Sequence, residues 1–142
     1  MSNDLNKKTY DLLLQNLKQK ILNSRIKAHL AVNSEMIQLY WKIGKEILDR
    51  QQQEGWGSKV IEQISKDLRY EFPEMKGLSP QNLKYMRKFA QEYTWNEFGQ
   101  QLVDQIPWGH NIKILYDIDE KEKRFWYIKK TIENGWSRNV LS

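Results

Sequence analysis

Helical periodicity runs through nearly the whole chain, and this feature leaves little room for any other architecture. Apolar residues recur at intervals of three and four, which is the spacing of one face of an α-helix. The 142 residues include only 7 Gly and 3 Pro, the residues that most often interrupt helices. The sequence therefore predicts an all-α fold. Its length predicts a single domain over residues 1–142, because domains usually span about 100–200 residues.

The longest periodic segment covers residues 9–50. Its apolar positions follow the helical period, but Asn33 and Gly44 within it are weak helix formers. We expect one long N-terminal helix or a helix pair, with Gly44 marking either a break or a close contact between helices. Further helices are predicted over 58–70, 79–93, 107–118 and 119–134, while residues 94–106 are predicted to form a loop.

Small residues mark the predicted helix ends and turns. Ser79 and Pro80 form a helix start, with a capping residue followed by proline at the first helical position. Ser58 is a second candidate N-cap, and Gly57 and Gly77 are expected in turns that need unusual backbone angles or close approach. Large aromatic residues at helical spacing are more often core than ligand contacts. We therefore assign a structural role to four tryptophans: Trp41, Trp56, Trp108 and Trp136.

Composition excludes several classes of function. The sequence has no cysteine, which excludes disulfides, cysteine-based zinc sites and a cysteine nucleophile. His29 and His110 lie far apart in no metal-ligand pattern, and no glycine-rich phosphate loop is present. We expect neither a cofactor, nor a metal site, nor enzymatic activity. No apolar run approaches the roughly 18 residues of a membrane span, and the first residues lack a signal-peptide pattern, so a cytoplasmic protein is expected.

One predicted helix, over residues 79–93, combines an apolar arc with a basic arc. The chain has 23 Lys+Arg against 18 Asp+Glu, a formal net charge of +5, which is compatible with a polyanionic partner. Lysine and arginine contact phosphates and guanine edges, and glutamine can pair with adenine. The residues opposite the apolar arc are Gln81, Lys84, Arg87, Lys88 and Gln91, and Lys59 and Lys66 on the preceding helix are possible DNA-backbone contacts.

The order of the two helices over 58–70 and 79–93 resembles a helix-turn-helix. Their connection is longer than the usual three or four residues, which indicates a variant with a winged-helix-like core. The alternative is an ordinary solvated charged face. The mixed charges of residues 107–142 are likewise typical of a solvated surface.

Other features leave a different class of function open. The long N-terminal helix and the many Trp and Tyr residues could supply an apolar seam to a second copy or to a nuclease subunit. In the same helix Lys18, Lys20, Arg25 and Lys27 have no acid among them, but they form no single stripe. A protein-interaction or dimerisation domain, including a homodimer, is therefore the alternative to DNA binding.

Several blocks of the chain resemble the N-terminal domain of the YhcG family, in order, over about residues 10–141. Residues 32–47 read VNSEMIQLYWKIGKEI, against a family pattern of VNxExIxLYWxIGxxI. The other matching blocks are Gly55-Trp56-Gly57, Phe72-Pro73, Gly77-Leu78-Ser79, Asn82-Leu83, Met86-Arg87, Ile106-Pro107-Trp108-Gly109-His110, Trp126-Tyr127 and Gly135-Trp136-Ser137-Arg138.

The resemblance implies a helical, helix-turn-helix-related domain that binds duplex DNA. In longer family members this domain precedes a nuclease domain of the PD-(D/E)xK type, associated with defence against foreign DNA or with its processing. Asn82, Lys84, Arg87 and Lys88 all fall on the basic helix identified above. Among the basic residues Arg87 matches the family pattern, whereas Lys84 and Lys88 come from the helical wheel alone. No strand-borne Asp followed by Glu-x-Lys is found here. The nuclease activity is therefore not transferred, and we expect an excised domain, a truncated product or a stand-alone module.

Overall fold

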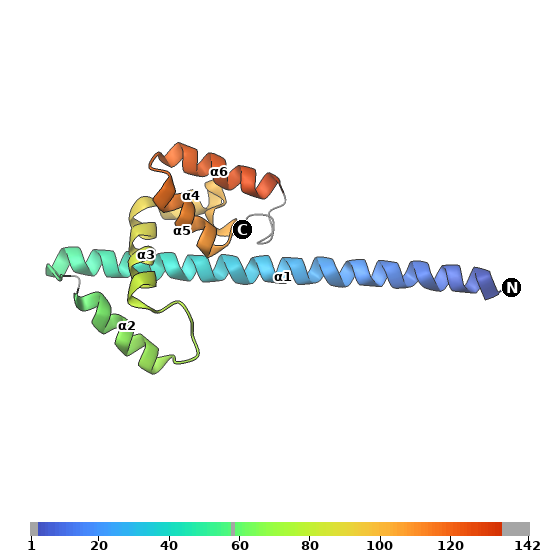
Figure 1. Ribbon diagram of the computed structural model, residues 1–142, viewed down its shortest axis with the longest axis horizontal. Helices are drawn as coiled ribbons and strands as arrows, with labels where there is room; N and C mark the ends of the chain where they lie inside the picture. Colours follow the sequence, from blue (N-terminus) through green and yellow to red (C-terminus); the bar gives the residue numbers. More distant parts are fainter. Residues whose placement is uncertain (1–2, 58, 135–142) are drawn as a thin grey trace. The chain divides into compact units, whose positions relative to one another are not determined.

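A computed structural model describes residues 3–57 and 59–134, and this part of the chain is helical without any strand (Figure 1). The all-α prediction is therefore confirmed. The chain divides into two compact units, residues 1–32 and residues 33–142. The helices are α1 (Asn3–Glu54), α2 (Lys59–Glu71), α3 (Pro80–Glu92), α4 (Trp95–Gln101), α5 (Trp108–Asp117) and α6 (Lys121–Glu133), with a short 3-10 helix, η1, at Val103–Gln105.

The long periodic segment forms one helix, α1, rather than a pair. Neither weak helix former breaks it. The side chain of Asn33 donates from Nδ2 to the carbonyl of Ile106 at 3.0 Å. Of the two alternatives predicted for Gly44, a break or a close contact between helices, the close contact is confirmed. A Cβ at this position would overlap the carbonyl of Met86 in α3.

The core of the 33–142 unit consists of two buried clusters, and α3 contributes to both. The first cluster joins α3 and the 33–54 part of α1 to the elements that follow α3, and the second joins the same two helices to α2. The first contains Ile37, Phe89, Tyr93, Phe98, Val103, Ile106, Leu115 and Ile128. The second contains Tyr40, Ile47, Ile61, Leu78, Leu83 and Met86. In Figure 1, α2 and the group α4–α6 lie on opposite sides of the 33–54 part of α1, with α3 crossing it.

Two of the four tryptophans have the structural role that the sequence predicted. The indole of Trp41 donates to the carbonyl of Tyr93 at 2.7 Å. Trp108 packs edge-on against Phe89, with ring centroids 4.9 Å apart. Trp56 differs, because its side chain is 46% exposed. Trp136 lies outside the described residues.

The prediction of a loop over residues 94–106 was wrong, because the segment folds into α4 and η1. A capping box starts α4: the Glu97 carboxylate accepts a hydrogen bond from the backbone N–H of Thr94 at 2.8 Å. Phe98, Val103 and Ile106 then anchor the segment in the core. Elements this short complete too few turns to show a helical period in the sequence.

The start of α3 agrees with its sequence signals. The Ser79 hydroxyl accepts a hydrogen bond from the backbone N–H of Asn82 at 3.1 Å, and Pro80 occupies the first turn. Gly77 has a φ of 87° and lies against the Tyr40 hydroxyl, so it meets both conditions predicted for it. Gly57 meets neither: it has no positive φ and open space around it. Ser58, the expected cap of α2, lies outside the described residues.

Candidate nucleic-acid interface

The arc of α3 opposite the core is formed by Gln81, Lys84, Lys88 and Gln91. The two glutamines are exposed and the two lysines half-buried. Their spacing of three, four and three residues places them along one line of the helix, over a length of about 15 Å at 1.5 Å per residue. The apolar arc holds α3 from behind, because Leu83, Met86 and Phe89 are fully buried. The helix thus presents a polar, cationic edge that the rest of the unit supports.

Arg87 lies at one border of this edge. Its Nη1 donates to the Oε1 of Gln51 in α1 at 2.8 Å. The hydrogen bond fixes one branch of the guanidinium, and arginine has five N–H donors in all. Gln51 of α1 therefore orients the Arg87 side chain, and the other N–H groups of the guanidinium can still bind a ligand.

An aromatic pair borders the other side of the edge. The Lys88 ammonium lies over the ring of Tyr116 in α5, 4.9 Å from the centroid, and Tyr116 packs edge-on against Tyr85 at 5.4 Å. Burial, and next the neighbouring Tyr85, raise the pKa of the Tyr116 hydroxyl, which therefore stays protonated at neutral pH. Sequence reasoning missed both tyrosines. Tyr85 stands beside Lys84 and Lys88 on the helical wheel, but Tyr116 comes from another helix.

Asn82 does not join this edge. Its Nδ2 donates to the carbonyl of Gly77 at 2.7 Å, and its Oδ1 accepts from the Trp108 indole at 2.8 Å. Both ends of the amide thus bond within the protein and fix the turn before α3. Lys59 and Lys66 lie on α2, a different helix, and both are exposed.

The connection between α2 and α3, residues 72–79, is held by side chains from both helices near the point where it enters α3. The buried Ser65 of α2 donates from its hydroxyl to the carbonyl of Leu78 at 2.6 Å. From α3, Asn82 donates to the carbonyl of Gly77. A connection longer than that of an ordinary helix-turn-helix is thereby kept ordered, and α3 is fixed relative to α2.

A hollow of about 370 Å³ lies between α1 and α2. Its walls are apolar, formed by side chains such as Ile43, Ile47, Val60 and Ile64, and Trp56 lies at it. Within residues 3–57 and 59–134, no three His, Asp or Glu side chains come together in a way that could hold a metal ion.

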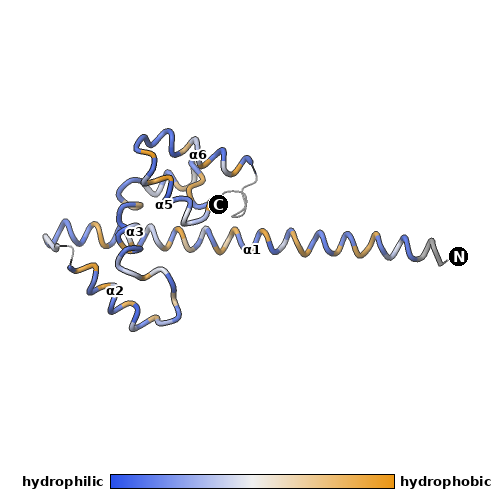
Figure 2. The backbone as a smooth tube through the Cα atoms, viewed as in Figure 1, coloured by the Kyte–Doolittle hydropathy of each residue, from blue (hydrophilic) through white to orange (hydrophobic). Residues whose placement is uncertain are grey.

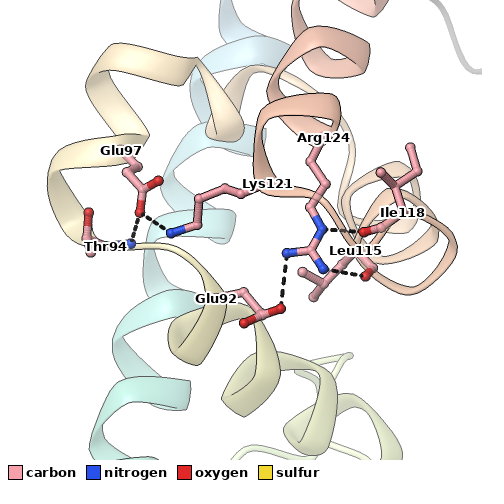
Figure 3. Close-up of polar contacts among 7 residues, drawn as sticks. All are labelled: Glu92, Thr94, Glu97, Leu115, Ile118, Lys121 and Arg124. Carbon is pink, nitrogen blue, oxygen red and sulfur yellow. Dashed lines mark hydrogen bonds and ion pairs between the residues drawn. The ribbon is translucent and has the colours of Figure 1, made fainter.

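Behind α3, a buried arginine joins three helices (Figure 3). Arg124 of α6 is only 3% exposed. It donates to the carbonyls of Ile118 at 2.5 Å and Leu115 at 3.2 Å, and it pairs with Glu92 at 3.1 Å. Cations are favourable at a helix C-terminus, where carbonyls lack intrahelical partners. The prediction that the charges of this region form a solvated surface was therefore wrong for Arg124.

A second polar contact in Figure 3 involves Glu97. Burial alone would raise the pKa of its carboxyl, but hydrogen bonds from the Thr94 backbone and from Lys121 outweigh burial, and the pKa lies below its usual value. The Lys121 ammonium lies 3.1 Å from the carboxylate. Glu97 thus stabilises the folded state above the carboxyl pKa of the unfolded chain, and this contribution is lost as the pH falls through the folded pKa.

Tyr93, at the end of α3, makes the stability of the unit sensitive to alkali. Burial raises the pKa of its hydroxyl from 10.0 to about 12, even though the charge of Arg124 opposes the shift. A raised pKa contributes stability that is complete below pH 10.0 and is lost as the pH rises towards 12. We expect Tyr93→Phe to lose less stability than the wild-type chain over this interval, in urea denaturation at a series of pH values. Equal losses in the two proteins would contradict this role, and Tyr70→Phe, at an 88% exposed position, is the control.

Residues 16–142 match the family model described as the DUF1016 N-terminal domain, which covers well over half of the chain. No curated protein and no solved structure matches the chain. In the described part of the chain, no helix is both long and apolar enough to cross a membrane.

Proposed function

Because the chain belongs to the DUF1016 N-terminal domain family, which is the YhcG N-terminal family, we propose that it is a DNA-binding module. The observation that carries the proposal is the edge of α3 formed by Gln81, Lys84, Lys88 and Gln91, whose opposite arc is anchored in the core. Lysines serve as phosphate contacts, and glutamines can read the edges of bases. Arg87, oriented by Gln51, adds a group suited to phosphate or guanine.

In this proposal α2 and α3 act as a helix-turn-helix-like pair, and α3 enters the major groove. An α-helix fits that groove in width, and the first helix of such a pair crosses the DNA backbone. Exposed Lys59 and Lys66 on α2 would then contact phosphates. The relation to winged helices is also part of the proposal, although residues 3–57 and 59–134 contain no strand to serve as a wing.

We further propose that the module targets a nuclease to DNA. In this arrangement the chain itself is not an enzyme, and cleavage comes from a nuclease domain or subunit joined to it. Membership of the family supports this proposal, because in longer family members the N-terminal domain precedes a nuclease domain. In this arrangement α3 would bind the DNA, and the nuclease domain or subunit would cleave it.

Reversing two charges on the edge tests DNA binding. We expect Lys84→Glu combined with Lys88→Glu to weaken the affinity for a random-sequence duplex at least about tenfold, because each lysine would neutralise a phosphate. The slope of log affinity against log salt should fall by roughly 2, about 0.9 for each contact. The measurement is fluorescence anisotropy of a labelled duplex, titrated at several salt concentrations.

The matched control is Lys123→Glu combined with Lys129→Glu, on the exposed part of α6. It changes the net charge equally but leaves α3 intact, so its affinity should stay close to that of the wild-type chain. A second variant, Arg87→Ala, should also weaken binding while the circular dichroism spectrum stays helical. Unchanged affinity in both α3 variants would refute the assignment, as would equal losses in the α6 control.

A further inference from the structure

Residues 3–32, the part of α1 that forms the first compact unit, carry large apolar side chains that are open to solvent. Figure 2 shows hydrophobic positions recurring along this part of α1. Large apolar patches on the surface of a monomeric protein often mark interaction sites. The exposed side chains, each between 45% and 68% accessible, are Tyr10, Leu12, Leu13, Leu17, Ile21, Leu22, Ile26 and Val32.

These side chains form two stripes on the helix. At 100° per residue, the first stripe follows alternating steps of four and three, which is the pattern of a coiled-coil seam. Large side chains fill this stripe from Tyr10 to Ile21, and small residues continue its spacing to Ala31. The first stripe consists of Tyr10, Leu14, Leu17, Ile21, Ser24, Ala28 and Ala31, and the second, on the opposite side, of Leu12, Leu22, Ile26 and Leu30.

Cations flank the first stripe on both sides. Lys18 and Arg25 directly follow seam positions, whereas Lys20 and Lys27 directly precede them. These are the positions whose charges select the partner in a coiled coil. No acidic residue occurs between Asp11 and Glu35, so no carboxylate lies among the four cations.

We propose that this face of α1 binds an acidic amphipathic helix of a partner protein, with aspartate and glutamate on both sides of an apolar seam. The large side chains of the first stripe, Tyr10 to Ile21, would pack into that seam, and the four cations would pair with the acidic flanks. Opposite charges at these positions favour the complex and set its register.

The charges argue against a second copy of the chain as the occupant. In a parallel pair of identical helices in register, Lys20 of one copy would face Arg25 of the other, and like charges at these positions destabilise the pairing. Nucleic acid would leave the apolar stripes uncovered, since its backbone offers phosphates and sugars.

The test uses the full chain and a synthetic probe peptide of about four heptads, with leucine at the seam and glutamate on both flanks. We expect the labelled peptide to bind in fluorescence anisotropy, and a peptide with lysine on the flanks not to bind. Changing Lys18, Lys20, Arg25 and Lys27 to glutamate should weaken binding of the acidic peptide at least about tenfold and create binding of the basic one. Leu17→Asp combined with Ile21→Asp should abolish binding of both.

The control for net charge also reverses four cations, at exposed positions of α5 and α6: Lys113, Lys123, Lys129 and Lys130, each changed to glutamate. The circular dichroism spectrum of each variant must stay helical. Equal binding of acidic and basic peptides, or an unchanged affinity in the charge-reversed chain, would overturn the proposal. It would also be overturned if the chain alone formed a dimer that Leu17→Asp with Ile21→Asp dissociates, or if it bound anionic vesicles or duplex DNA through these four cations instead of the peptide. DNA binding by α3 is judged separately, because Lys84 and Lys88 stay unchanged.

Discussion

Replacing Gly44 with alanine is expected to destabilise the 33–142 unit by about 1–3 kcal/mol, the usual cost of forcing extra atoms into a packed site. A Cβ at this position would overlap the carbonyl of Met86 and lie 2.9 Å from the backbone nitrogen of Arg87. These are backbone atoms, which cannot turn aside as a flexible side chain would. Relief therefore requires α1 and α3 to move apart, which loosens both core clusters.

The free energy of unfolding, measured by urea denaturation, checks this expectation. The matched control is Gly109→Ala in α5, where no atom lies within 4 Å of the added Cβ. Alanine is favoured over glycine inside a helix by roughly 0.5–1 kcal/mol, so the control should be as stable as the wild-type chain or slightly more stable. If the two alanine variants were equally stable, α1 and α3 would not approach as closely as the structure shows.

Replacing Arg124 with methionine is expected to cost about 3 kcal/mol of stability. The substitution removes the donors for the carbonyls of Leu115 and Ile118 and leaves Glu92 without its cation. Breaking a buried ion pair from one side typically costs about 3–5 kcal/mol. We expect the lower end of this range, because the Glu92 side chain is 34% exposed and water can partly solvate it.

Lys121→Met is the comparison for this experiment. It breaks the ion pair with Glu97, but the lysine side chain is 45% exposed, and such pairs contribute at most about 1 kcal/mol. Thermal or urea denaturation of both variants should therefore separate a buried from an exposed pair. A loss in Arg124→Met no larger than that in Lys121→Met would mean that the three-helix junction contributes little.

The helices with complete sequence signals could be predicted, and α3 is the clearest case. The Ser79-Pro80 start and the division into an apolar and a basic arc agree with each other, and both appear in the structure. Residues 94–106 carried no such pattern, because α4 and η1 are short and are held by Phe98 and Val103 in the core. The spacing of apolar residues within a short segment carries no information about its contacts with residues distant in the chain.

The candidate interface could be predicted in part, for the same reason. The helical wheel found Lys84 and Lys88, since both belong to one element. It could not find that Tyr116 lies beneath the Lys88 ammonium, or that Asn82 is bound to Gly77 and Trp108. These contacts join residues from different elements and depend on tertiary packing. Whether this surface binds DNA stays a prediction.

The position of α3 between the two core clusters also bears on how the 33–142 unit unfolds. Leu83 and Met86 belong to one cluster and Phe89 to the other, one helical turn away. The 33–54 part of α1 also contributes to both clusters, through Ile37 in one and Tyr40 in the other, so the two halves of this core are coupled through two shared helices. Such coupling produces one cooperative transition rather than two separate ones.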